Sequence, residues 1–78
     1  MPTVFREGPY RYFFYSADGH EPPHVHVERD QNVAKFWLDP VRLADSGGFG
    51  ARELRSIEAA VRQHRDRLLG AWNDYFAD

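Results

Sequence analysis

The sequence predicts an α+β fold: an antiparallel sheet of four to five strands, followed by a C-terminal helix or two helices packed on one face. First, residues 3–44 hold runs of β-branched and aromatic residues separated by turn dipeptides. Second, apolar residues after residue 50 recur every three or four positions, which is the helical period. Strands followed by helices are typical of α+β domains. We expect a single domain over residues 1–78, with the sheet in 1–44, a glycine-rich connector in 45–50 and the helical part in 51–78.

The first two strands are predicted to form a hairpin. The segment from Thr3 to Glu7 alternates weakly and ends at Gly8-Pro9, which is a turn dipeptide. The segment from Tyr10 to Ser16 has the strongest β propensity in the chain because five of its seven residues are aromatic. Ala17-Asp18-Gly19 is then predicted to form a second turn.

The third strand is predicted to begin after Pro22-Pro23. A diproline fixes φ and disfavours helical geometry for the residue before it, so the following residues should be extended. Successive side chains of a strand point to opposite faces. Two imidazoles and a carboxylate therefore share one face, those of His24, His26 and Glu28.

A fourth strand is predicted over residues 33–38, stopped by Asp39-Pro40, and a short edge strand over residues 41–44. If the third and fourth strands pair with their apolar faces together, Lys35 and Trp37 lie on the same side as the histidines. The helices should cover the other face, which carries Val25, Val27, Phe36 and Leu38.

The helical part is predicted to contain a break. Its apolar side chains form one stripe, made of Leu54, Ile57, Val61, Leu68, Trp72 and Phe76. A continuous helix over residues 51–77 would be about 40 Å long, which overhangs a compact domain of this size. We therefore expect the helix to bend or break near His64-Arg65-Asp66.

The composition excludes several classes of protein. The 78 residues include no cysteine, so the chain has neither disulfides nor a thiolate zinc site, and we expect a cytoplasmic location. No run of about 18 apolar residues is present, so no membrane-spanning helix is predicted. The formal net charge is −2. Neither half of the chain is basic, which argues against sequence-specific DNA binding.

The histidine strand has three interpretations. His24 and His26 can reach one metal ion, with His20 as a third ligand and Glu28 as a fourth, and zinc or nickel would suit these donors. Alternatively, His24, His26 and Lys35 are catalytic candidates for acid–base chemistry, as in a metal-independent ribonuclease. The third interpretation is that the histidines form the solvent-exposed face of a half-buried strand.

Several segments carry a family resemblance. Residues 18–27 read DGHEPPHVHV and residues 34–38 read AKFWL. Together with residues 1–6, 8–11, 14–16, 51–54, 71–73 and 75–76, these segments resemble the prokaryotic family called domain of unknown function 4160. The residues that match the family motif are His20, Glu21, Pro22, Pro23, His24, His26, Lys35, Trp72, Asn73 and Tyr75. The family has no established activity, and the resemblance implies one component of a two-gene, toxin–antitoxin-like pair.

We therefore expect a small cytoplasmic binding or regulatory module whose histidine-rich strand is the functional surface. The expected partner is a small protein encoded in the same operon, and RNA is a further candidate ligand. The expected binding surface consists of Tyr15, Glu21, Glu28, Lys35 and Trp37. The alternative is a small ribonuclease-like or metal-binding protein that uses His20, His24 and His26.

Overall fold

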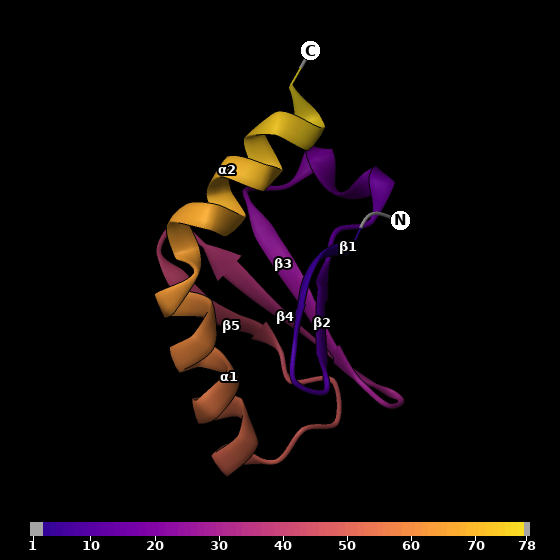
Figure 1. Cartoon of the computed structure of the whole chain (residues 1–78), viewed down its shortest axis with the longest axis vertical. Coiled ribbons are helices and arrows are strands. Elements are labelled where there is room, and N and C mark those ends of the chain that lie inside the picture. The colour runs from indigo at the N-terminus through magenta and orange to yellow at the C-terminus, as the bar shows by residue number, and fades with distance from the viewer. Residues whose placement is uncertain (1–2, 78) are drawn as a thin grey trace.

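The fold is a five-stranded antiparallel sheet followed by two helices, which confirms the predicted α+β class (Figure 1). The computed structural model describes residues 3–77. Met1 and Pro2, which belong to the family resemblance, and Asp78, which ends the predicted helical part, lie outside the described residues. The strands lie side by side in chain order and are β1 (Thr3–Glu7), β2 (Tyr10–Phe13), β3 (His24–Arg29), β4 (Asn32–Leu38) and β5 (Val41–Asp45).

The helical part consists of α1 (Ala51–Gln63) and α2 (Arg65–Phe76). The two helices follow one another along the long axis of the molecule (Figure 1). They are separated at His64, which caps the end of α1 and the start of α2. The predicted break is therefore confirmed. No helix within residues 3–77 is long and apolar enough to cross a membrane.

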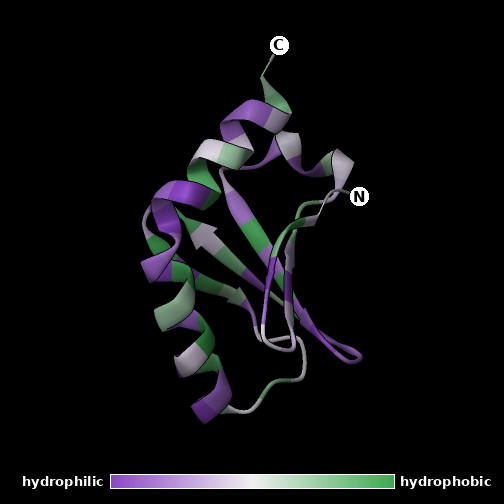
Figure 2. Cartoon of the chain, viewed as in Figure 1, coloured by the Kyte–Doolittle hydropathy of each residue, from purple (hydrophilic) through white to green (hydrophobic). Residues whose placement is uncertain are grey.

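The core lies between the helices and one face of the sheet. Alternation along β3 and β4 places four apolar side chains on that face with no exposed surface, those of Val25, Val27, Phe36 and Leu38. Ile57 and Val61 of α1 and Leu68 of α2 pack against them. Full burial of one such side chain stabilises the fold by about 1.5–3 kcal/mol. In Figure 2 the central strands carry the green hydrophobic bands, whereas the turn between β3 and β4 is purple.

The segment between β2 and β3 differs from the expected turn. Residues Ser16–His20 form a short 3-10 helix, η1, and β2 ends at Phe13, three residues before the predicted end. η1 lies beside the C-terminal turn of α2 (Figure 1). The two elements touch where the backbone of Gly19 approaches the Phe76 ring, because a β carbon at Gly19 would lie 2.8 Å from that ring. η1 is thereby held over the beginning of β3.

An ion pair connects the sheet to the first turn of α1. Glu53 accepts two hydrogen bonds from the guanidinium of Arg29 and a third from the Tyr10 hydroxyl, whose oxygen lies 2.7 Å away. A bidentate pair of an arginine and a carboxylate fixes the relative orientation of the two side chains as well as their distance. This contact therefore sets where α1 begins against β2 and β3.

Candidate functional site

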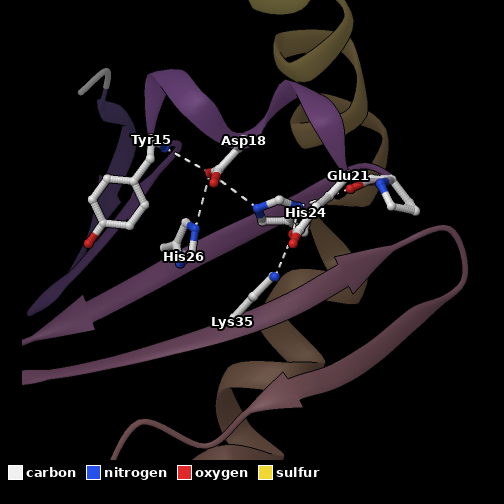
Figure 3. Close-up of polar contacts among 7 residues, drawn as sticks. Tyr15, Asp18, Glu21, His24, His26 and Lys35 are labelled. Carbon is white, nitrogen blue, oxygen red and sulfur yellow. Dashed lines mark hydrogen bonds and ion pairs between the residues drawn. The ribbon is translucent and has the colours of Figure 1, made fainter.

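Asp18 of η1 and His24 and His26 of β3 form a compact cluster of metal-ligand donors. The Oδ2 atom of Asp18 lies 3.1 Å from Nε2 of His24 and 3.1 Å from Nε2 of His26. Figure 3 shows both imidazole rings turned toward this carboxylate, which descends from the 3-10 helix above the strand. The donor atoms all lie within 4.8 Å of one another.

The backbone before β3 fixes the orientation of His24. The diproline keeps the chain extended, so the Pro22 carbonyl projects toward the ring two residues later. The Nδ1 atom of His24 lies 2.9 Å from the Pro22 oxygen. A carbonyl oxygen only accepts hydrogen bonds, so Nδ1 is the donor and carries the proton. In the neutral ring, Nε2 then holds a lone pair that faces Asp18.

The Nε2 atom of His24 is buried and has no hydrogen-bond partner. The side chain is 0% exposed. Its ring is enclosed by Trp37 on β4 and Trp72 on α2, with ring centroids 5.6 and 4.9 Å away. A buried polar atom without a partner costs about 1–3 kcal/mol. Nε2 of His24 therefore needs either a proton or a metal ion between itself and the Asp18 carboxylate.

Asp18 holds a charged carboxylate at this position. Burial raises the pKa of its carboxyl group, the hydrogen bond from the Tyr15 N–H opposes this, and the pKa is lowered overall. The Tyr15 nitrogen lies 2.8 Å from the same Oδ2 atom that faces the two histidines. Asp18 is thus oriented by η1 and remains ionised, as a metal ligand must be.

Two aromatic side chains pack against the ring of His26 and restrict its orientation. Its ring stacks on Phe13 of β2, and Tyr15 packs edge-on at a centroid distance of 4.6 Å. Burial lowers the pKa of His26, while the Asp18 carboxylate partly opposes this shift. The ring therefore favours the neutral form, which is the form that binds metal ions.

Lys35 and Glu21 form an ion pair beside the cluster. Lys35 lies across from His26 in the register of β3 and β4, and His24 lies across from Trp37, so the predicted common face of these side chains is confirmed. The Nζ atom of Lys35 lies 2.6 Å from Oε1 of Glu21. The hydrogen bond from Lys35 is the main reason that the pKa of Glu21 is lowered.

The predicted site residues are only partly brought together. His20 lies at the exposed end of η1, outside the donor cluster. Glu28 is on the expected face but forms an ion pair with Arg11, with Nε and Oε1 2.8 Å apart. Tyr15 remains 41% exposed at the edge of the cluster.

The interpretation of the histidines as a solvent-exposed face is wrong for His24, which has no exposed surface. Alternation along a strand identifies which face a side chain points to, but it does not show what covers that face. Here η1 folds back from above and α2 reaches the beginning of the strand, so the ring is enclosed.

The sequence interpretation missed Asp18 as a member of the cluster. Its motif position, directly before a glycine, favoured a turn, and turn residues are usually solvated. The available signal was the short separation in sequence, because only Glu21, Pro22 and Pro23 lie between η1 and β3. No local pattern specified which of the nearby acidic residues would point inward.

The donor set fits a divalent transition metal. In a tetrahedral site with bonds of about 2.0–2.2 Å, neighbouring ligand atoms are about 3.3–3.6 Å apart. The two 3.1 Å separations from Asp18 are close to that spacing, and the third separation lies within 4.8 Å, so the two histidine rings would have to turn toward one another to complete the site. The hydrogen bond from His24 to the Pro22 carbonyl is the outer contact that usually orients a metal-binding histidine. Zinc and nickel both suit two imidazoles and a carboxylate.

Comparison with known proteins gives one family match. The family model described as a domain of unknown function, DUF4160, matches residues 10–73, from the start of β2 into the last part of α2. No curated protein and no solved structure matches the chain. The match contains the donor cluster and the Lys35–Glu21 pair. The chain therefore belongs to the DUF4160 family.

Proposed function

We propose that this protein binds a divalent transition-metal ion, zinc or nickel, through Asp18, His24 and His26. The observation that carries the proposal is the orphaned Nε2 atom of His24, which is fully buried and points at Asp18 Oδ2 with no proton between them in the neutral ring. A metal ion at this point would bond to both atoms and to His26. Three protein ligands are typical of zinc sites that keep one position open for another molecule.

Acid–base catalysis without a metal is supported less well. A general base must reach a proton of the substrate, either directly or through one water molecule. His24 is enclosed on all sides, and its Nδ1 is already used by the Pro22 carbonyl. A proton on Nε2 would face Asp18 in a place that solvent does not reach, so it could not be passed to a substrate. A metal ion satisfies the same atoms while both imidazoles stay neutral.

Equilibrium dialysis against zinc and nickel, followed by elemental analysis, tests the proposal. The wild-type protein should retain one ion per chain. Asp18→Asn and His26→Gln should weaken retention by at least about 100-fold, because each removes one of three ligands. His64→Gln, which changes a histidine away from the cluster, is the matched control and should retain the ion. His20→Gln tests whether that neighbouring histidine contributes. Wild-type protein that retains no ion would contradict the proposal.

A second candidate function is docking of a small protein partner, as in a two-gene toxin–antitoxin-like pair. Its support is the exposed aromatic Tyr15, which lies against the ring of His26 and is the kind of residue that anchors interfaces. Co-purification with the protein encoded beside it tests this candidate. Tyr15→Ala should release the partner, whereas Tyr75→Ala, which alters an exposed tyrosine on α2, should not.

A further inference from the structure

The metal cluster leaves a coordination position for a ligand from outside the protein. Three side chains supply donors, whereas a zinc ion takes at least four ligands. Asp18 and His26 keep 14% and 12% of their side-chain surface exposed, and His24 keeps none. The remaining position therefore opens to solvent on the side of Asp18 and His26, which is the face of the sheet opposite the helices.

A positive charge lies beside this opening. Lys35 is the cross-strand neighbour of His26, and directly opposed residues have β carbons about 4.5–5.5 Å apart. Figure 3 shows the lysine reaching from β4 toward Glu21, next to the two rings. The Nζ atom also lies 4.5 Å from the centre of the Trp37 ring, which further restricts the lysine. The ammonium group is thus held on the same face of the sheet as the donor cluster.

The Glu21 carboxylate is an oxyanion that Lys35 already binds on this face. Its Oε1 atom lies 2.6 Å from Lys35 Nζ and 3.7 Å from Nδ1 of His24. Glu21 is 49% exposed. An exposed ion pair of this kind contributes little to stability. An anion that bonded to both the metal ion and Lys35 would therefore displace Glu21 at little cost.

The charge of the site selects among oxyanions. A divalent ion, the Asp18 carboxylate and the Lys35 ammonium leave two net positive charges once Glu21 has moved away. A phosphomonoester carries about −1.5 to −2 at neutral pH, while an internal phosphodiester or a carboxylate carries one negative charge. Lysine is a common phosphate ligand because it acts as a compact charge. We infer that the metal ion and Lys35 together bind a terminal phosphate group, and this inference rests on the metal site proposed above.

Cobalt substitution allows the inference to be tested separately from the metal site. Cobalt-loaded protein should show a visible absorption spectrum that changes when adenosine monophosphate is added. Adenosine, which has no phosphate, and the dinucleoside ApA, which has only an internal diester, should leave the spectrum unchanged. Lys35→Gln should bind cobalt normally but bind adenosine monophosphate about tenfold or more weakly, because a charge-assisted hydrogen bond is lost.

Arg42→Gln is the matched control. Arg42 lies on β5 across from Trp37, so the substitution removes one positive charge from the same face without touching the ion pair. It should change the affinity for adenosine monophosphate by less than about twofold, since an exposed charge farther away is screened. Equal losses in Lys35→Gln and Arg42→Gln would overturn the role of Lys35. An unchanged spectrum in cobalt-loaded wild type, or equal binding of ApA, would overturn the phosphomonoester site. Failure to bind cobalt at all would instead overturn the metal site itself.

Discussion

The Nε2 atom of His24 lies 3.1 Å from the Oδ2 atom of Asp18, and the hydrogen bond from Nδ1 to Pro22 leaves no proton between them when the ring is neutral. Two electron-rich atoms therefore face one another in a site from which the His24 side chain has no access to water. A metal ion between them would convert this unfavourable contact into two bonds. Metal binding and stability of the fold should consequently be coupled.

The first prediction is that zinc raises the melting temperature of the domain. A ligand that binds only the folded state at 100 times its Kd stabilises it by about 2.7 kcal/mol. For a domain of this size, that corresponds to a rise of about 10–20 °C, which scanning calorimetry can measure. Magnesium should give no comparable rise because it prefers oxygen ligands in an octahedral arrangement. Asp18→Asn should abolish most of the zinc effect, and an undiminished rise in this variant would place the zinc elsewhere.

The second prediction concerns Gly47 in the connector before α1. Its φ of +60° is left-handed, and a β carbon there would lie 1.8 Å from the backbone oxygen of Val33. Gly47→Ala should therefore destabilise the domain by about 2 kcal/mol or more, measured by urea denaturation. Gly50→Ala is the matched control, because a β carbon at that position meets no atom within 4 Å. Equal stability of both variants would show that the connector does not approach β4 so closely.

The third prediction is a pH dependence that belongs to Glu53. The hydrogen bonds from Arg29, and next from Tyr10, lower the pKa of Glu53 in the folded state. Its contribution to stability should be complete above the unfolded pKa of about 4.3 and lost as the pH falls through the lower folded value. Glu53→Gln should be less stable than wild type at neutral pH, and the difference should shrink in acid. Acid titrations of stability that run parallel in the two proteins would contradict this role.

The strands and helices followed from local patterns. Alternation identified the pairing faces of β3 and β4, and the length of the helical stripe required the break that occurs at His64. The strand faces and the helix break depend on side-chain periodicity and chain length, and both can be read from the sequence. In the glycine-rich connector predicted over residues 45–50, Gly47 packs against the backbone of β4, and no local pattern predicted that contact.

The candidate site was harder to predict because it depends on contacts between distant elements. His24 and His26 were singled out by their spacing, and Lys35 by the register of β3 and β4. Asp18 joined them only because η1 folds over the beginning of β3, where Gly19 packs against Phe76 near the C-terminal end of the chain. A local pattern contains no information about that contact, so the inward carboxylate could not be distinguished from other acidic residues.

Anomalous X-ray diffraction from crystals grown with zinc would show whether Asp18, His24 and His26 bind the ion, because it locates the ion without reference to activity. We expect one strong peak per chain, about 2.0–2.2 Å from Nε2 of His24, Nε2 of His26 and Oδ2 of Asp18. The same crystals should show the Nδ1 atom of His24 still bonded to the Pro22 carbonyl. A peak at His20 or His64, or no peak at the cluster when zinc is in excess, would contradict the proposed metal site.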